Sequence, residues 1–437
     1  MNVKHHARRR QALLRKLGPG VLILPTAAHV LRNGDVHYEF RPGSDFSYLT
    51  GFPEPEAVLV AWQTKGGHRS ALFVLPRDPE REMWDGRRHG VRGATSKFGV
   101  DEAYPIGELW QRLPKLIAGH QRVFHTLGRD RGFDDRLLGL MKSAAWTQRR
   151  SNPPQHSQFE DPAPVIAEMR LIKEAGEVDI LDRSAAITAA GHSAAMRAAR
   201  PGIEEFVVQA ELEAEFRRRG SPRNGYPSIV ASGANACILH YTQNDRRLRR
   251  GDLLLIDAGA ELEGYTTDVT RTFPVSGTFN EAQREVYQIV LDAQKAGIRA
   301  ARPGAAWDAP HRACLRKLTS GLIGLGLLRG KVSQLVKDEK YKPWYPHGTT
   351  HWLGMDVHDA GAYQASRAPV KLRPGMVLTI EPGLYFGARD LTIPKRLRGI
   401  GVRIEDDVLV TRGGNRVMTA AVPKEWRDVE AACQGVD

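Results

Sequence analysis

A chain of 437 residues with 41% hydrophobic content can bury a large core, and its length predicts two or three domains. The net charge of +13, from 63 Lys and Arg against 50 Asp and Glu, suggests nucleic-acid or anionic-membrane binding as one interpretation. The basic residues are spread along the chain, and no RNP, zinc-finger or helix-turn-helix pattern is found, so we expect no nucleic-acid partner. No run approaches the ~18 apolar residues of a membrane span, so we expect no membrane partner.

Two features of the sequence bear on its compartment. The one dense basic cluster, which we interpret as a solvated terminus, consists of Lys4, Arg8, Arg9, Arg10, Arg15 and Lys16. A signal peptide is not predicted, because Arg15 and Lys16 interrupt the place of its apolar segment. Cys237, Cys314 and Cys433 are odd in number and form no Cys-x-x-Cys pair, which argues against a disulfide framework or a cysteine zinc site. We therefore expect a reducing compartment, the cytoplasm.

The first third of the chain alternates short apolar runs with helical patterns, which predicts an α/β domain. The expected strands are 21–24, 58–62, 71–75 and 123–126, and the expected helices are 107–117 and 134–143. The proline-rich segment at about 149–163 cannot continue a helix or a central strand, so we expect the linker there. The predicted domains are residues 1–163 and 164–437.

The second part of the chain begins with a helical pattern over 164–200 and then repeats itself. The hexapeptide Arg-Ala-Ala-Arg-Pro-Gly occurs at 197–202 and again at 299–304, each time closing an alanine-rich helix. A glycine, an apolar run, one carboxylate and another glycine follow in the same order at 251–259 and 375–383. Two repeats in one order indicate an internal duplication with pseudo-twofold symmetry, in which each half presents an acid at a strand end.

Few acids and histidines lie in or beside apolar, strand-like segments, where an isolated charge is costly unless it is paired or bound to metal. They include Asp257, Asp268, His351, Glu381 and Glu405. Alone, a strand-end acid is more typical of a cap or a salt-bridge partner. Together, four converging carboxylates require positive charge, which two divalent ions of manganese, cobalt or zinc would supply. Such a pair of metals could hydrolyse a carbonyl compound by attack of a bridging metal-bound hydroxide.

This set of motifs resembles the aminopeptidase P and prolidase group, whose catalytic domain has the α+β pita-bread fold of methionine aminopeptidase and creatinase. The resemblance covers nearly the whole chain, and the family's ligand order of Asp, Asp, His, Glu, Glu matches Asp257, Asp268, His351, Glu381 and Glu405. It implies that Asp268 and Glu405 bridge two divalent ions, with manganese expected first. It also implies that Asp257 completes one site and that His351 with Glu381 completes the other, with Glu381 also taking part in catalysis.

Three further histidines, His240, His347 and His358, match the substrate-side histidines of this family. A single buried histidine is more often structural, but the resemblance implies that these three bind the substrate and donate hydrogen bonds to the scissile carbonyl and its oxyanion. Arg403 and Tyr385 also match family positions. We expect them to orient carboxylates and steady charge, Arg403 in catalysis and Tyr385 beside the substrate.

Motifs in the first domain indicate which member of the group this is. The segments that resemble bacterial aminopeptidase P are 44–52, 54–58 and 84–88. The resemblance implies that Trp84 reaches a neighbouring subunit's site and contacts substrate, so we expect a homo-oligomer, a dimer or tetramer. The implied activity is hydrolysis of the bond between the first residue of a peptide and a penultimate proline. The alternatives are a prolidase, which cleaves Xaa-Pro dipeptides with the same ligands, and a non-catalytic binding protein on this scaffold.

Overall fold

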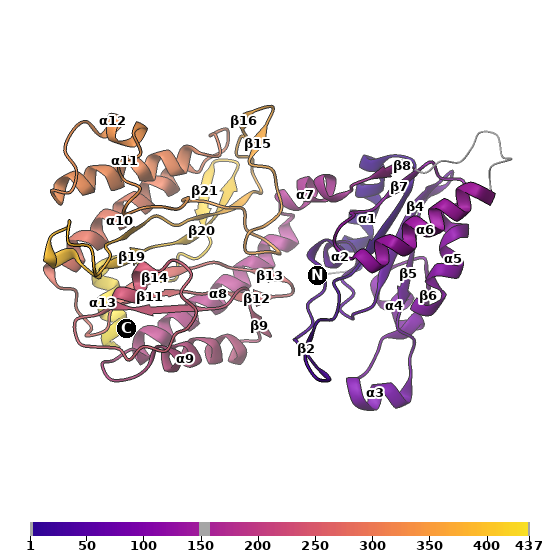
Figure 1. Ribbon diagram of the computed structural model, residues 1–437, viewed down its shortest axis with the longest axis horizontal. Coiled ribbons are helices and arrows are strands. Elements are labelled where there is room, and N and C mark those ends of the chain that lie inside the picture. The colour runs from indigo at the N-terminus through magenta and orange to yellow at the C-terminus, as the bar shows by residue number, and fades with distance from the viewer. Residues whose placement is uncertain (1–2, 148–157, 436–437) are drawn as a thin grey trace. The chain divides into compact units, whose positions relative to one another are not determined.

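The computed structural model describes residues 3–147 and 158–435, which belong to two compact units, Met1–Met169 and Arg170–Asp437 (Figure 1). The first part of the predicted linker, up to residue 157, lies outside the described residues. Its remainder contains strand β8 (Gln158–Glu160) and the first residue of helix α7 (Ala163–Leu171), within which the two units divide. In the described part of the chain, no helix has the length and apolar character needed to cross a membrane.

The N-terminal unit is built on one six-stranded mixed sheet in the order β6-β5-β4-β1-β7-β8. Its other strands are β1 (Val21–Pro25), β4 (Val58–Thr64), β5 (Gly67–Val74), β6 (Glu102–Pro105) and β7 (Arg122–Phe124), with a separate hairpin of β2 (Leu31–Asn33) and β3 (Val36–His37). Its helices are α1 (Val3–Leu17), α2 (Ser44–Thr50), α3 (Pro79–Asp85), α4 (Gly90–Phe98), α5 (Leu109–Ile117) and α6 (Arg131–Thr147). Apolar side chains of β1, β4 and β5 pack against α5 and α6, which confirms the predicted α/β character. Strands β6 and β8 were not predicted, because they are short and only partly buried.

The interpretation of the basic N-terminal segment as a solvated terminus was wrong for two of its six basic residues, since Lys4, Arg8, Arg15 and Lys16 are exposed but Arg9 and Arg10 are not. The segment forms helix α1, in which the side chains of Arg9 and Arg10 are buried. The guanidinium of Arg9 lies 3.9 Å from the centre of the Tyr48 ring, and Arg10 Nη1 donates a hydrogen bond to the carbonyl of Leu49 at 2.8 Å. Both charges are therefore satisfied inside the unit by an aromatic face and by the last carbonyls of α2.

The C-terminal unit consists of two similar halves. The first half, residues 175–274, combines helices α8 (Ala175–Ala198) and α9 (Glu205–Arg218) with an antiparallel sheet of β10 (Ile229–Ser232), β11 (Leu253–Asp257) and β14 (Thr270–Pro274). The second half, residues 281–417, combines α10 (Glu281–Ala300) and α11 (Ala309–Gly324) with β17 (Val377–Ile380), β20 (Asp406–Thr411) and β21 (Gly414–Val417). In Figure 1, the strands of both halves lie between the helix pair α8–α9 and the helix pair α10–α11.

Shorter elements connect these layers. They are β9 (Arg223–Asn224), β12 (Ala260–Leu262), β13 (Tyr265–Thr266), α12 (Val332–Lys337), β15 (Gln364–Ala365), β16 (Ala368–Pro369), β18 (Gly383–Tyr385), β19 (Gly401–Arg403) and α13 (Trp426–Gln434). The single helix predicted for 164–200 was wrong, since the chain forms α7 and α8 with a break between them. Glu174 begins α8 there, in a reciprocal capping arrangement with Glu177.

The repeated hexapeptide ends in the same backbone arrangement in both halves. The N–H of Gly202 donates to the carbonyl of Leu248 at 2.9 Å, and the N–H of Gly304 donates to the carbonyl of Leu372 at 2.8 Å. Both glycines have left-handed backbone angles, with φ of +98° and +82°, which explains why glycine ends each copy. An isolated β-bridge accompanies each contact, Glu204 with Arg247 and Ala306 with Lys371. The internal duplication predicted from the sequence is therefore present in the fold.

Candidate metal centre and active site

Four of the five predicted metal ligands, the acids, lie at or beside strand ends from both halves. Asp257 ends β11 and Glu381 directly follows β17, in agreement with the repeated sequence pattern. Asp268 lies between β13 and β14, and Glu405 lies between β19 and β20, so both project from short connections rather than from strands. His351 lies in the irregular segment between α12 and β15. All five line one cavity of about 530 Å³, which we call the site cavity.

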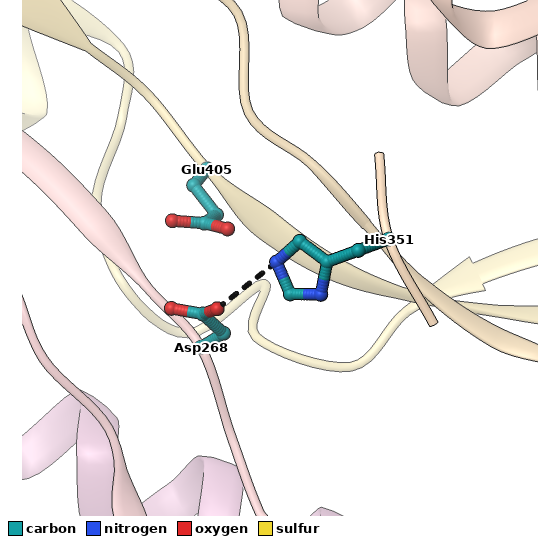
Figure 2. A group of neighbouring side chains, drawn as sticks. All are labelled: Asp268, His351 and Glu405. Carbon is teal, nitrogen blue, oxygen red and sulfur yellow. Dashed lines mark ion pairs between the residues drawn. The ribbon is translucent and has the colours of Figure 1, made fainter. Parts of the chain in front are cut away.

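Three of these residues come together most closely (Figure 2). One ligand atom from each of Asp268, His351 and Glu405 lies within 4.8 Å of the others. His351 Nε2 is 3.3 Å from Asp268 Oδ2 and 3.5 Å from Glu381 Oε1. The other ring nitrogen, Nδ1, lies 3.1 Å from the carbonyl of Trp352, which can only accept a hydrogen bond. In the neutral ring, Nδ1 therefore carries the proton, and Nε2 presents its lone pair to the acids, as a metal ligand requires.

The charge distribution at these residues calls for a cation. Burial raises the pKa of Glu381 to about 7, although the positive charges of His351 and Arg403 oppose it. Burial and the charge of Asp268 raise the pKa of Glu405 well above its usual value. Burial alone would lower the pKa of His351, but its hydrogen bond to Asp268 and the nearby negative charge raise it to about 9. A buried set of carboxylates with one imidazole is the donor set that divalent manganese, cobalt or zinc prefers, so these residues fit such metals.

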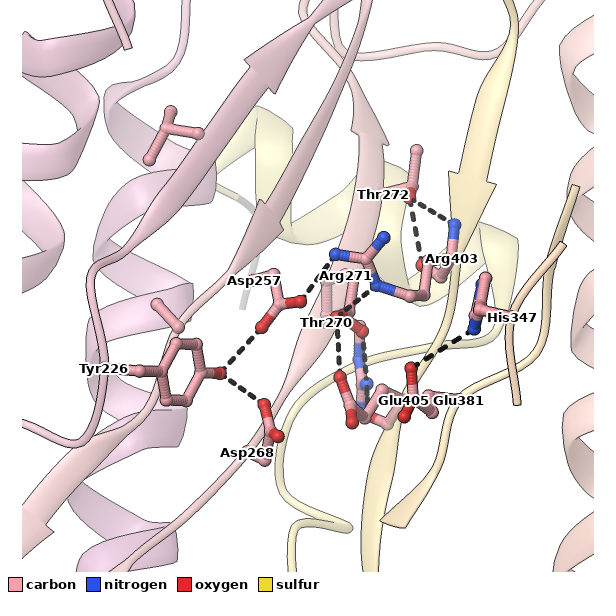
Figure 3. Close-up of polar contacts among 12 residues, drawn as sticks. Tyr226, Asp257, Asp268, Thr270, Arg271, Thr272, His347, Glu381, Arg403 and Glu405 are labelled. Atoms are coloured by element: carbon pink, nitrogen blue, oxygen red, sulfur yellow. Dashed lines mark hydrogen bonds and ion pairs between the residues drawn. The ribbon is translucent and has the colours of Figure 1, made fainter. Parts of the chain in front are cut away.

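Asp257 differs from the other acids because an arginine neutralises it (Figure 3). Arg403 Nη2 lies 2.5 Å from Asp257 Oδ2. Burial opposes ionisation, but the charge of Arg403 and a hydrogen bond from Tyr226 hold the pKa of Asp257 below its usual value. Arg403 Nε also donates to Thr270 Oγ1 at 3.1 Å, and that hydroxyl donates to Glu405 Oε2 at 2.7 Å. Arg403 thus connects an acid of the first half with an acid of the second.

Tyr226 and Asp407, which were not predicted, also contact the ligands. The hydroxyl of Tyr226 donates to Asp257 Oδ1 at 2.7 Å and also contacts Asp268 Oδ1 (Figure 3). Burial and the surrounding carboxylates raise the pKa of Tyr226 well above its usual value, so it stays a donor. Asp407 Oδ2 accepts a hydrogen bond from the N–H of Asp268 at 3.1 Å, which fixes the backbone of that ligand. A tyrosine before a proline and the third acid of an acidic run carry no ligand spacing, so the sequence offered no signal for either.

The three predicted substrate-side histidines line the same site cavity as the ligands. His240 and His358 are exposed, whereas His347 is half-buried. The ring of His358 lies 4.4 Å from the ring of His351, at an angle of 71° between the ring planes. The exposed imidazoles of His240 and His358 can therefore contact a molecule bound in the cavity.

His347, Tyr385 and Arg403 form a chain of hydrogen bonds beside the acids. Arg403 Nη1 donates to the Tyr385 hydroxyl at 3.1 Å, and this hydroxyl lies 2.7 Å from His347 Nε2. His347 Nδ1 must donate to the carbonyl of Gly348, which is 2.6 Å away, so Nε2 accepts from the tyrosine. Burial, followed by the charge of Arg403, lowers the pKa of His347 to about 3, so the ring is neutral at physiological pH.

Trp84 is the one predicted site residue that belongs to the N-terminal unit. It lies near the end of helix α3, and 84% of its surface is exposed. Its predicted contact with a partner's substrate stays a prediction.

The duplicated fold and the acids around its site cavity define a metallopeptidase, and the chain belongs to metallopeptidase family M24. The family model for Metallopeptidase family M24 matches residues 179–412, and the model for the aminopeptidase P N-terminal domain matches residues 6–124. These matches confirm the predicted pita-bread domain and the separate N-terminal domain.

Relatives and solved structures cover almost the whole chain. The Xaa-Pro aminopeptidase of Escherichia coli strain K12 is 44% identical over 97% of this chain and 96% of its own length. Xaa-Pro aminopeptidase 1 of Streptomyces coelicolor is 38% identical over 97% of this chain and 86% of its own length. The structure of Pseudomonas aeruginosa aminopeptidase PepP has a TM-score of 0.97 at 44% identity, covering 100% of this chain and 99% of that chain. A zinc-substituted Escherichia coli aminopeptidase P in complex with product has a TM-score of 0.96 at 42% identity, with the same coverage.

Proposed function

We propose that this chain is a metal-dependent Xaa-Pro aminopeptidase, which hydrolyses the bond between the first residue of a peptide and a penultimate proline. The observation that carries the proposal is the site cavity of about 530 Å³, in which all five predicted ligands lie together with the three predicted histidines. The names of the relatives that are 44% and 38% identical over nearly the whole chain support the same activity.

The donor set supports two divalent ions per chain. We assign Asp268 and Glu405 as bridging ligands, Asp257 to one ion, and His351 with Glu381 to the other. Manganese is the metal that we expect, and zinc is an alternative supported by the zinc-substituted relative. When bound, such a metal pair activates a water molecule for attack and stabilises negative charge on the carbonyl oxygen.

The remaining residues of the site cavity have roles that follow from their contacts. His240 and His358 are exposed and can donate hydrogen bonds to the scissile carbonyl. The neutral His347 is oriented by Tyr385 and supports the proline side of the substrate. We assign Glu381, which lines the same cavity, to proton transfer: it would take the proton of the attacking water and deliver it to the leaving nitrogen.

Proline makes a particular demand that this site can meet. An Xaa-Pro bond has no N–H to donate, so an enzyme cannot hold its substrate through that group. The site cavity offers apolar side chains for the ring instead, namely Pro227, Ile229, Leu239 and Val357. A cavity lined by both charged ligands and apolar residues thus fits a free amino end followed by proline.

The proposal includes an assembly, a compartment and a domain division. We infer a homo-oligomer, a dimer or tetramer, in which Trp84 contacts a partner's site; the exposure of Trp84 and of Met83 beside it supports this. We assign residues 1–163 to the N-terminal domain and 164–437 to the catalytic domain. The cytoplasm is supported by Cys237, Cys314 and Cys433, which form no disulfide. A strictly monomeric, fully active enzyme by light scattering would contradict the assembly.

The test compares kcat/KM for Xaa-Pro-Xaa, Xaa-Pro and Xaa-Ala-Xaa peptides with manganese at saturation. We expect the proline tripeptide to be cleaved at its first bond and to exceed its alanine analogue by at least about tenfold. A clear preference for the dipeptide would instead indicate a prolidase. Metal-loaded protein that cleaves none of the three would indicate a binding protein on this scaffold.

A further inference from the structure

A second group of buried charges lies in the C-terminal unit outside the predicted ligand set. Lys173, Arg170 and Asp359 expose only 5%, 4% and 6% of their surface. Lys173 Nζ lies 2.9 Å from Asp359 Oδ2, and Arg170 Nη2 lies 2.5 Å from Asp359 Oδ1. The same Arg170 nitrogen lies 2.6 Å from Asp356 Oδ2. Two cations that precede α8 are therefore paired with the buried Asp359 and with Asp356 at the edge of the group.

The two acids flank the turn that carries His358. The N–H of Asp359 donates to the carbonyl of Trp352 at 2.9 Å, and the N–H of Asp356 donates to Asp359 Oδ1 at 3.3 Å, so the turn closes on itself. His358 lies between the two acids in sequence, lines the site cavity, and has its ring 4.4 Å from that of His351. The contacts of the two acids therefore lie on either side of this histidine in the turn.

The buried pair is also joined to the frame that carries a predicted ligand. The N–H of Lys173 donates to the carbonyl of Gly375 at 2.8 Å, just before β17, the strand that leads to Glu381. A Cβ atom on Gly354 would lie 2.3 Å from Asp359 Oδ2 and 3.0 Å from Lys173 Cε, so glycine at this position leaves room for the pair. Turn and strand are thus held at a fixed spacing.

A purely stabilising role would explain this group less well. Buried ion pairs commonly contribute no more stability than apolar side chains of similar size, because both charges lose their hydration. What such a pair does supply is a defined geometry, since each charge must find its partner. Here that geometry fixes a turn whose central histidine is exposed to the site cavity.

We propose that Arg170, Lys173 and Asp359 are positioning residues that hold His358 in place at the site cavity. The inference rests on the proposed function, which assigns His358 to the substrate. An imidazole that is already fixed when substrate arrives loses no further freedom on binding, which lowers the cost of reaching the transition state. Changes in the buried group should therefore act on catalysis through His358.

A double-mutant cycle tests this dependence. Lys173→Met removes the charge at similar size. The value of kcat/KM for an Xaa-Pro-Xaa peptide at manganese saturation is measured for the parent, for Lys173→Met, for His358→Ala and for the double variant. We expect Lys173→Met to lower kcat/KM by about 10- to 100-fold in the parent and by less than about twofold in the His358→Ala background. Metal content should stay at the parent level throughout. Equal losses in both backgrounds would overturn the proposal.

Two further variants guard against unfolding and nonspecific effects. Asp356→Asn is milder, because 41% of that side chain is exposed and it is joined to Arg170 at the edge of the group. Its smaller loss should also disappear in the His358→Ala background. Arg183→Met is the matched control, since it breaks an exposed pair with Glu263, at 2.9 Å in the same unit, and should leave kcat/KM unchanged.

Amide hydrogen exchange supplies a measurement that does not depend on activity. In Lys173→Met, the amides of Asp356 and Asp359 should exchange faster, while those of β17 keep their protection. If the parent cleaves no proline peptide, the proposed function fails, and the exchange result still decides whether the group holds the turn. If the parent is active and the turn exchanges as before, the positioning proposal is wrong while the proposed function stands.

Discussion

The two halves of the C-terminal unit present equivalent acids in opposite electrostatic states. Asp257 and Glu381 occupy the same strand-end position in the repeat, yet the pKa of Asp257 is held below its usual value and that of Glu381 is raised to about 7. Burial favours the protonated form of both. Arg403 pairs directly with Asp257 at 2.5 Å and Tyr226 donates a hydrogen bond to it, whereas the nearby charges of Asp268 and Asp257 raise the pKa of Glu381 further. The duplication thus places the carboxylates, whereas residues outside the repeated pattern set their charge.

The largest effect should come from removing an acid that serves both halves. Asp268→Ala or Glu405→Ala is expected to abolish binding of both ions, because each residue is assigned to bridge them. The value of kcat/KM should then fall by more than about 10³-fold, beyond the loss from removing a single oxyanion donor. Elemental analysis and peptide kinetics measure the two effects, and a variant with full metal content and activity would refute the bridging assignment.

Variants of two histidines should lose turnover but keep their bound metal. His240→Ala and His358→Ala are expected to keep both ions and to lose turnover by roughly 10²- to 10³-fold, because these exposed side chains are assigned to the substrate. Steady-state kinetics on metal-analysed protein provides the measurement. If either variant loses metal, that histidine is a ligand and its assignment changes.

Arg403 pairs directly with Asp257 and not with Glu381, so changing it tests the comparison between the two halves. Arg403→Gln should leave Asp257 without its cation and lower kcat/KM by about 10- to 100-fold, the range seen when a partner of a metal ligand is removed. Arg403→Lys keeps the charge but not the planar guanidinium group, so its kcat/KM should lie between those of the parent and Arg403→Gln. Unchanged kinetics and metal content in Arg403→Gln would show that this pairing is not needed.

The smallest change that we expect concerns stability. Burial opposes ionisation of Asp359, but Lys173 and Arg170 hold its pKa below the usual value. A carboxyl with a depressed pKa contributes stability above the unfolded-state pKa of about 4, and that contribution is lost as the pH falls through the lower folded-state pKa. Asp359→Asn should therefore cost about 2 kcal/mol of unfolding free energy at neutral pH. In denaturant titrations, the difference in unfolding free energy between Asp359→Asn and the parent should become smaller below about pH 4. A difference that does not change with pH would contradict this.

Local sequence patterns were sufficient for the buried, apolar strands of the N-terminal sheet and for two of the acids at strand ends. The strands at 21–24 and 58–62 are apolar runs between breakers, and Asp257 and Glu381 follow such runs directly. Contacts between segments that are distant in the chain could not be predicted from the sequence. Tyr226 and Asp268 are 42 positions apart, and Lys173 and Asp359 are 186 apart, so no spacing rule connects them.

The break between α7 and α8 shows the same limit. The helical pattern continues through residues 172–174, so the sequence predicted one helix. In the fold, the N–H of Lys173 donates to the carbonyl of Gly375 and Glu174 caps the new helix, which ends the first helix there. A backbone partner from the other half therefore overrides the local preference.

We propose that the two halves together hold two divalent ions, one completed by each half. Elemental analysis of manganese-saturated protein tests this most directly, with Asp257→Asn and Glu381→Gln as variants confined to one half each. We expect two ions in the parent chain, about one in each of these variants, and none in Asp268→Ala. One ion or fewer in the fully active parent would contradict the claim.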